Sequence, residues 1–528
     1  MKRLQILLLI QSTILTPLQA QTFDQGYDTW NERTANEPYN VGCHSLNPVW
    51  LADNPVCDFG VARVGYTLGR GDFHAPDASG RTGNIDAYVG GLRRIGKIYL
   101  AGHIGYSNSS LSDMQWNSTL GIDSSNPFIL GDSVCSDQTI EQFRMKAAAA
   151  YQISPQWTLG LSVGLTTGRL SDQTDPRPET SSSDIPVTAG AAWRPNAKMQ
   201  IGLDAGIRFY RSDISHIIID PLTNHVFFLM KGNGDYYRRS SADVGGYERE
   251  YKGNYRHVAA QVKYDFNSQW TDFLELSYER GSEKATDEGS TPFHGGDYKP
   301  TAIALSNRLK RTDGRGNLHN LIVAGHYLKG DATWYDQKKV VDTDHGNRYY
   351  YQVLSSYKIQ ENTSFDGMVE YRYERMRNAR RDFFADLTLA ADNFNRKHYG
   401  SQGSIQQKAT VLKADVAAGK SFMIKDVNLE AVLRAGYSMP AGDDFGDASS
   451  YAGENIARTY SMPVFEYQTA RQTRFGCTVN AFKPLSGNLT AGAYARVDTR
   501  LYGGDSNYSD RFESTSFTTA EVGLFLHF

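Results

Sequence analysis

The sequence has little of what a helical membrane protein, a metalloprotein or a nucleic-acid-binding protein requires. Among its 528 residues, four are Cys and 17 are Pro. Beyond the N-terminus, no apolar run approaches the roughly 20 residues that a membrane-spanning helix needs. The formal net charge is −3, so the chain lacks the excess of basic residues that marks a nucleic-acid-binding protein. Together these shortages exclude a helical membrane protein and a nucleic-acid partner.

The N-terminus has the pattern of a secretory signal peptide. Lys2 and Arg3 precede an uncharged, mostly apolar stretch from Leu4 to Leu15. Ala20 then supplies a small residue before a cleavage site. The sequence therefore predicts a signal peptide over residues 1–20 and an exported mature chain.

The four cysteines do not form a metal-binding pattern. Cys135 falls in a polar stretch and Cys477 in an alternating one, far from each other. Cys43 and Cys57 are closer, and in an oxidising compartment they could form a disulfide, with separate thiols as the alternative. We therefore expect no metal site and no other cofactor.

Instead of apolar runs, the chain has apolar residues at every second position. The last stretch shows this best, because Ala520, Val522, Leu524, Leu526 and Phe528 alternate with mostly polar residues. Side chains of a strand point alternately to its two faces, so this stretch predicts a strand with one apolar face. The same alternation recurs in pairs of segments from Phe59 onward. Each pair is joined by a short turn and separated from the next by a longer polar stretch.

This arrangement predicts an all-β fold, a transmembrane antiparallel β-barrel over residues 58–528. We count about 18 strands, in a range of roughly 14–18. Tyr and Trp gather near the strand ends, as they do at a lipid–water boundary. A soluble β-sandwich or propeller is the less favoured alternative. Short turns should face the periplasm and long loops the exterior, with outward loops near 108–140, 212–253, 281–299, 377–404 and 439–468.

Two local interpretations can be tested directly. The β-rich runs on either side of residues 221–224 predict a hairpin that pairs 216–219 with 226–230. The triplet Gln360-Glu361-Asn362 predicts a turn that separates a strand over 349–357 from a strand over 365–373.

Residues 21–57 lack strand alternation and contain two Asn-Pro pairs, which break regular structure. This segment is either a periplasmic tail or a plug inside the barrel. Trp30, Tyr39, Trp50 and Leu51 favour the plug, because a solvated tail would not need them.

If the apolar residues face lipid, the residues between them face the lumen. Both signs of charge occur there, and six of these residues are candidates for lining the lumen: Arg308, Lys358, Glu370, Arg372, Glu374 and Arg434. They could form a selectivity zone for ions or a polar solute. Cross-strand ion pairs that stiffen the wall are the favoured alternative. Among catalytic motifs, His-Glu-x-x-His and Gly-x-Ser-x-Gly are both missing, so we expect no enzyme.

The closing strand, the signal peptide and the repeating hairpins make the mature chain resemble outer-membrane β-barrels of the Bacteroidota, a Gram-negative group. Some of these form families without an assigned activity. Asn47-Pro48 is also similar to the Asn-Pro-Ala tract in the long-chain fatty-acid transporter family, although Val49 stands where that family has Ala. The resemblance implies an outer-membrane location, lipid contact and insertion by the barrel assembly machinery, with the terminal Phe528 as assembly signal. It also implies a pore, transporter or solute-binding barrel, or alternatively a surface-exposed accessory of a TonB-dependent type uptake complex.

Overall fold

The computed structural model describes residues 40–528, except 245, 289–290, 344–345, 347, 378–379, 401–402, 448–455, 487–488, 505–507 and 509–510. The predicted signal peptide, its cleavage after Ala20 and residues 21–39 of the N-terminal segment therefore lie outside the described residues.

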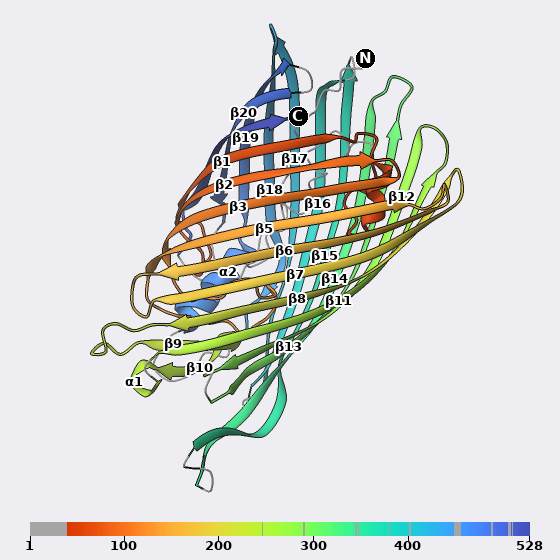
Figure 1. The fold of residues 1–528 in the computed structure, drawn as a ribbon. Helices are drawn as coiled ribbons and strands as arrows, with labels where there is room; N and C mark the ends of the chain where they lie inside the picture. The colour runs from red at the N-terminus through yellow and green to blue at the C-terminus, as the bar shows by residue number, and fades with distance from the viewer. Residues whose placement is uncertain are drawn as a thin grey trace.

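Within the described part of the chain, 18 strands form one closed antiparallel sheet (Figure 1). Each strand pairs with the next one along the chain, except that β4, β9 and β10 are left out, and β21 returns to pair with β1. The predicted fold class is thus confirmed. The barrel strands are β1 (Phe59–Gly71), β2 (Arg81–Ile95), β3 (Ile98–Met114), β5 (Ser136–Gln152), β6 (Trp157–Asp172), β7 (Pro178–Asn196), β8 (Met199–His216), β11 (Tyr247–Asp265), β12 (Trp270–Asp287), β13 (Phe293–Thr312), β14 (Leu318–Asp342), β15 (Arg348–Arg377), β16 (Arg380–Gly400), β17 (Gly403–Ile424), β18 (Val427–Asp444), β19 (Gln472–Ser486), β20 (Leu489–Tyr502) and β21 (Ser516–His527).

The remaining elements lie at the ends of the barrel or inside it. A second, three-stranded sheet contains β4 (Leu130–Asp132), β9 (Val226–Gly232) and β10 (Asp235–Ser240) of the described residues. The helical elements are η2 (Pro48–Asp53), α1 (Ser241–Val244), η3 (Ala457–Ser461) and α2 (Met462–Thr469). Figure 1 shows α1, α2, β9 and β10 together at the lower left end.

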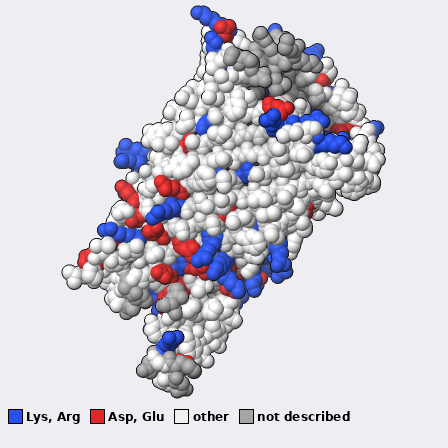
Figure 2. Space-filling model, in the orientation of Figure 1, with Lys and Arg blue, Asp and Glu red and all other residues white. Residues whose placement is uncertain are grey.

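The wall turns its apolar side chains outward. Leu203, Leu433 and Leu524 are 60 %, 64 % and 61 % exposed, although each belongs to a long, regularly paired strand. Figure 2 shows charged side chains toward the two ends of one face, with an almost uncharged band between them. Such a continuous apolar surface suits contact with lipid and is far larger than the patches on soluble monomers.

The barrel closes where the two ends of the sheet meet. Residues 61–71 of β1 pair with residues 517–527 of β21. One step further, the N–H of Phe528 donates to the Gly60 carbonyl at 3.0 Å, and the N–H of Gly60 donates back at 2.7 Å. The terminal residue thus takes part in the last hydrogen-bonded pair of the seam. Its role as an assembly signal stays a prediction.

Short turns such as 96–97, 197–198 and 425–426 lie at one end of the barrel, the short-turn end. The other end carries the longer connections 115–135, 217–246 and 445–471. This division agrees with the predicted pattern, while the end that faces outward stays a prediction.

Two of the predicted outward loops are largely strand. The predicted loop 377–404 is mostly β16, which crosses the whole wall and exposes Leu387 and Leu389 on its outer face. The predicted loop 281–299 is also mostly strand, because β12 runs to Asp287 and β13 starts at Phe293. The predicted turn at Gln360-Glu361-Asn362 is wrong as well, since β15 runs through it as one strand of 30 residues.

The predicted hairpin between 216–219 and 226–230 is also wrong. β9 pairs instead with β10, across Asn233 and Gly234, and on its other edge with β4. Asn233 and Gly234 have positive φ angles of 45° and 81°. This backbone is what a two-residue hairpin turn requires, and Asn-Gly adopts it readily.

Candidate functional site

Residues 40–57, hereafter the inner segment, lie inside the barrel at its short-turn end. The turn η2 follows Asn47, whose side chain accepts a hydrogen bond from the Val49 N–H, and a Pro occupies its first turn. Such a cap satisfies a donor that would otherwise have no partner, and Pro has no N–H to satisfy. Val49 and Trp50 are 0 % and 2 % exposed. Trp50 packs edge-on against Phe273 of β12, with ring centroids 5.0 Å apart.

Polar contacts also fix the inner segment to the wall. Asn47 Nδ2 donates to Gln261 Oε1 at 3.0 Å and to the Leu203 carbonyl at 3.2 Å. Asp53 forms ion pairs with Lys263 at 2.6 Å and with Arg194 at 3.2 Å. Both basic residues lie close to short turns, so the inner segment is held at the rim as well as within the lumen.

Three wall glycines make room for the inner segment. A Cβ atom on Gly160 of β6 would lie 2.8 Å from Pro48 Cγ and 2.9 Å from the backbone nitrogen of Val49. A Cβ atom on Gly190 of β7 would collide with the Asn47 side chain, and one on Gly202 of β8 would meet Trp50 and Gln261. Because real Cβ atoms essentially never come within 3.0 Å of such atoms, the wall is shaped to this segment.

The opposite end of the interior is filled by residues 115–135 and 226–240, hereafter the loop layer. Phe128, Phe227 and Leu229 are 0 % exposed and belong to one apolar cluster with residues of the wall. The loop layer therefore packs inside the mouth of the barrel rather than extending away from it.

Charged residues of the wall form hydrogen bonds with the loop layer. Arg249 of β11 pairs with Asp287 at 2.5 Å, and its Nη1 donates to the Phe128 carbonyl at 3.3 Å. Glu283 of β12 accepts hydrogen bonds from Asn126 Nδ2 and from the Tyr255 hydroxyl, both at 2.6 Å. The wall and the loop layer thus share buried polar contacts as well as an apolar core.

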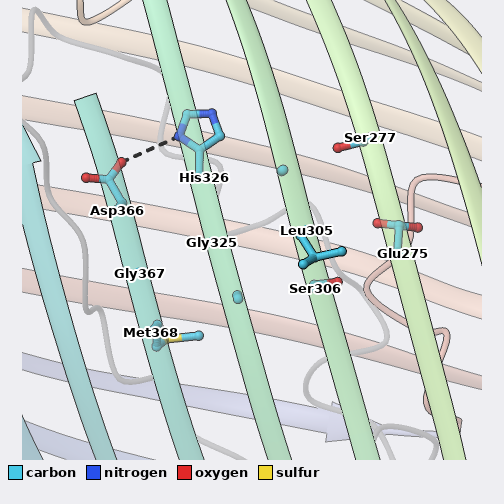
Figure 3. A pocket seen from close by; sticks show the side chains of 11 residues that line it. Glu275, Ser277, Leu305, Ser306, Gly325, His326, Asp366, Gly367 and Met368 are labelled. Atoms are coloured by element: carbon cyan, nitrogen blue, oxygen red, sulfur yellow. Dashed lines mark hydrogen bonds and ion pairs between the residues drawn. The ribbon is translucent and has the colours of Figure 1, made fainter. Parts of the chain in front are cut away.

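Between the inner segment and the loop layer, the inner face of β12–β15 carries a pocket of about 190 Å³ (Figure 3). The position of the pocket along the barrel axis follows from the contacts of β12. Phe273 contacts the inner segment, Glu275 and Ser277 line the pocket, and Glu283 contacts the loop layer. The pocket is therefore part of an internal chamber with a packed layer on either side.

Two neighbouring cross-strand rows form the floor of the pocket. One row is Glu275, Ser306, Ala324 and Met368, and the other is Ser277, Ala304, His326 and Asp366. Three of the four central side chains, Ser306, Ala324 and Ala304, are small and leave a hollow in the floor, and the fourth is His326. Figure 3 shows Glu275 on one side, and on the other the pair His326–Asp366, whose Nδ1 and Oδ2 atoms are 3.5 Å apart. The arrangement can bind a small polar solute across four strands.

Five of the six predicted lumen residues lie on the inner face. Arg372 forms an ion pair with Asp386 of β16 at 2.8 Å and lies 3.7 Å from Glu370. Arg434 Nη1 donates to the Thr478 hydroxyl at 3.0 Å. These cross-strand pairs fit the expectation of a stiffened wall better than that of a selectivity zone.

Glu374 belongs to a buried charge cluster that includes residues not predicted together. Arg381 Nη2 lies 2.9 Å from Glu430, and Arg381 Nη1 lies 3.7 Å from Glu374. All three side chains are at most 3 % exposed. Sequence reasoning placed Arg381 in an outward loop, whereas it stands at the start of β16.

Lys358 lies on the outer face of the wall, so its prediction as a lumen residue is wrong. Ala332 pairs with Gln360 and Thr333 with Lys358, which leaves Ile359 as an extra residue in β15. Because a β-bulge shifts the alternation by one position, every side chain beyond it changes face. Lys358 accordingly forms exposed ion pairs with Asp331 and Glu361, both at 2.8 Å.

Of the two alternatives for Cys43 and Cys57, the disulfide is not formed between these two described residues. The Cys43 sulfur lies 3.5 Å from Nη1 of Arg308, the remaining predicted lumen residue. The Cys57 sulfur lies 3.6 Å from the Asn54 carbonyl instead. Each thiol therefore has its own polar neighbour in the inner segment or the wall.

Buried carboxyl groups occur in the connections at the long-loop end. Burial raises the pKa of Asp132 in β4 from 3.8 to about 7, and the nearby Asp172 carboxylate adds to this rise. Burial likewise raises the pKa of Asp77 to about 6. Both groups can therefore lose their proton near neutral pH.

Residues 48–528 match a protein family whose description is "Family of unknown function" (DUF6850). The chain belongs to this family. A comparison with curated proteins found no match.

Solved structures that resemble this chain include transporters and an import receptor. The RagAB peptide transporter is 8 % identical, with a TM-score of 0.40 over 89 % of this chain and 86 % of that chain. The copper transporter OprC is 10 % identical, with a TM-score of 0.37 over 87 % and 80 %. The ferric-catecholate import receptor Fiu from E. coli K12 is 9 % identical, with a TM-score of 0.37 over 90 % and 82 %. These scores are too low to transfer a property of those proteins to this chain.

The site residues that sequence reasoning missed include Asn47 and the glycines that receive it. Asn-Pro at positions 47–48 was interpreted as a breaker, whereas a cap residue followed by Pro is also the signal of a helical start. Among the described residues, no group of three or more His, Cys, Asp or Glu side chains is arranged to hold a metal ion. No helix in the described ranges is long and apolar enough to span a membrane.

Proposed function

We propose that this protein is an outer-membrane transport barrel that is closed at rest, with the inner segment as its gate. The apolar outer wall supports a location in lipid. The filled interior supports a closed resting state, because a barrel of this strand number otherwise leaves an aqueous channel. The role requires no catalysis, and its partners would be outer-membrane lipid and the barrel assembly machinery.

The packing of the inner segment carries this proposal. Val49 and Trp50 lose nearly all their exposure in the lumen, and burial of each side chain contributes about 1.5–3 kcal/mol. Since about 1.4 kcal/mol changes an equilibrium tenfold, these contacts alone favour the closed state strongly.

The test is single-channel conductance in planar bilayers. Full-length protein should conduct little, whereas a variant lacking residues 24–56 should show stepwise openings. A heat-dependent shift in gel mobility would show that the shortened barrel is folded. If that variant folds and conducts no more than the full-length protein, the inner segment is not the gate.

A full-length variant tests the same proposal without the risk that the deletion prevents folding. Trp50→Ala combined with Asp53→Asn removes one apolar contact and both ion pairs but keeps the chain length. We expect intermediate conductance, together with increased antibiotic sensitivity of cells that carry it. A Leu46→Ala variant is the matched control, because Leu46 belongs to the same segment but is 53 % exposed.

A second candidate function, a surface-exposed accessory of an uptake complex, is favoured by one feature. Beyond Thr333, β14 pairs only with the first part of β15, and this two-stranded ribbon extends past the other strands (Figure 1). Val341, Tyr350 and Leu354 on it are 55 %, 48 % and 62 % exposed. An isolated pair of strands is marginal in water, so a partner would stabilise it. Gentle extraction and pull-down, with and without residues 336–355, would show a partner that depends on the ribbon; recovery of a lone barrel argues against this function.

A further inference from the structure

We propose that the pocket on β12–β15 binds a linear aliphatic amine with a positive charge at each end, and that this binding is coupled to the inner segment through Glu275. The inference deepens the proposed transport function and rests on it. It is drawn from the charges, the shape and the neighbours of the pocket.

The charge of the lining selects a cation. Glu275 and Asp366 contribute two carboxylates, and His326, paired with Asp366, is the one basic side chain among the described residues that line the pocket. A carboxylate can only accept hydrogen bonds, so the complementary ligand is a donor with positive charge. A phosphate, a sulfate or a fatty acid would meet repulsion at both sides.

The shape of the lining selects a linear molecule with an alkyl body. Glu275 lies on β12 and Asp366 on β15, three strand spacings apart, which places their backbones about 14–16 Å from each other. Ser306, Ala324 and Ala304 leave a hollow between them, and Met368 adds an apolar side chain. A linear diamine or polyamine suits this arrangement, because it carries a positive charge at each end of a narrow alkyl chain.

The same lining argues against a sugar. Protein sites for sugars commonly stack a pyranose on an aromatic ring, using its large apolar face. The residues that line the pocket include no Phe, Tyr or Trp among those the structure describes. An alkyl chain needs no such platform, and Ala and Met side chains suit it.

Glu275 connects the pocket with the gate. Its Oε2 accepts a hydrogen bond from the Ser45 hydroxyl of the inner segment. On the neighbouring strand, Gln261 lies opposite Glu275 and holds Asn47 at 3.0 Å. An ammonium group that pairs with Glu275 competes with Ser45 for the carboxylate. Ligand binding and the position of the inner segment are therefore thermodynamically linked, each weakening or strengthening the other by the same factor.

Isothermal titration calorimetry on the detergent-purified full chain tests the proposal, with cadaverine and spermidine as probes. The neutral diol with the same carbon chain as cadaverine is the ligand control. We expect saturable binding of at least one amine at one site per chain, and none of the diol. Equal binding of the diol, or the absence of saturation with both amines, would overturn the proposal.

Variants locate the site. Asp366→Asn and Glu275→Gln each remove one charge and should weaken amine binding about tenfold or more, the usual effect of losing a charge-assisted hydrogen bond. Glu521→Gln is the matched control, because Glu521 accepts a hydrogen bond from Tyr494 on β20, away from the pocket. Unchanged affinity in both pocket variants would show that the amine binds elsewhere, and the proposal would be wrong.

The outcome is separable from that of the proposed function. Conductance of the variant that lacks the inner segment needs no ligand, so an opened barrel without amine binding would retain the transport role and reject this inference. If the full-length protein binds the amine but the variant that lacks the inner segment conducts no more than the full-length protein, the gate is rejected and the binding site is retained. Ser45→Ala adds a test of the link, since loss of the competing hydroxyl should tighten amine binding; an unchanged or weaker affinity would reject the coupling.

Discussion

The Ser45 hydroxyl donates a hydrogen bond to the Glu275 carboxylate, although the two residues are 230 positions apart in the chain. Ser45 belongs to the inner segment and Glu275 to the pocket, so a single contact joins the two parts of the interior that the proposals concern. Two steps along β12, Phe273 supports Trp50 of the same segment. The strand β12 thus contacts the inner segment and also lines the pocket.

A methyl group on Gly160, one of the three wall glycines that make room for the inner segment, should open the barrel. In Gly160→Ala, the new Cβ would lie 2.9 Å from the backbone nitrogen of Val49, which cannot move away as a flexible side chain could. We expect higher conductance than in the unmodified protein and a folded barrel. Gly105→Ala is the control, because a Cβ there has no neighbour nearer than 3.8 Å. If both variants conduct alike, the fit between glycine and inner segment has no role in closure.

Loss of Arg381 should destabilise the barrel strongly. Removal of one partner from a buried ion pair leaves an uncompensated charge, at a cost of about 3–5 kcal/mol. Arg381→Ala would leave Glu374 and Glu430 facing each other in a site where both are 3 % exposed. Urea unfolding in lipid vesicles, followed by tryptophan fluorescence, measures the change in the free energy of unfolding.

The comparison for that experiment is Arg211→Ala. Arg211 is 54 % exposed and pairs with Asp213 and Glu250 on the outer surface. Exposed pairs contribute about 0–1 kcal/mol. Equal destabilisation by the two variants would contradict the role of burial at Arg381.

The loop layer should loosen as pH rises through neutrality. The pKa of Asp132 is raised to about 7 by burial, so the docked layer binds a proton that the undocked layer, with an ordinary carboxyl pKa, has already lost. Stability from this group is therefore complete below about pH 4 and falls as pH rises to about 7. Amide hydrogen exchange of β4 and β9, corrected for intrinsic rates, should be about tenfold faster or more at pH 8 than at pH 5.

Asp132→Asn supplies the control for this pH dependence. The amide cannot ionise and keeps nearly the same shape, so exchange in the variant should change much less with pH. Equal pH dependence in the variant and the unmodified protein would assign the effect to another group, such as Asp77, whose pKa burial raises to about 6.

The orientation of the barrel can be read from its own thiols. Cys135 is the exposed last residue of residues 115–135 in the loop layer, whereas Cys57 is the last residue of the inner segment, at the short-turn end. A membrane-impermeant maleimide added to intact cells should label Cys135, and Cys135→Ser should abolish that signal. Labelling of Cys57 instead, as shown with Cys57→Ser, would mean that the short turns face outward.

The sequence predicted the barrel wall well because alternation depends only on which face meets lipid. It predicted the right number of strands through two errors that cancel. One strand, β15, was divided at Gln360-Glu361-Asn362, and β16 was overlooked. Gln360 and Asn362 look like turn residues, but they point inward, where the Gln360 side chain donates to Asn362 at 2.7 Å and Asn362 donates to the Ser125 carbonyl. Ser125 belongs to the loop layer, and local sequence patterns cannot reveal a contact with so distant a residue.

The residues of the candidate site were harder to predict from the sequence, because their roles also depend on contacts between distant parts of the chain. Glu370, Arg372 and Arg434 could be placed on the inner face by counting in steps of two along a strand. Lys358 could not, because the extra residue Ile359 reverses the count and leaves no local sign. The roles of Asp366 and Ser45 depend on contacts with His326 and Glu275, which are far from them in the chain.

The position of the inner segment has a consequence for the order of events during biogenesis. The contacts of the inner segment with the wall lie on strands β1–β3, β5–β8 and β11–β13 of the described chain, and all of these strands precede β14. The docking surface is therefore complete before the strands that close the ring have joined. A chain truncated after β13 should already protect residues 40–57 from protease. The growing sheet would then curl around a segment that is already in place, and the membrane would at no stage contain an unblocked hole.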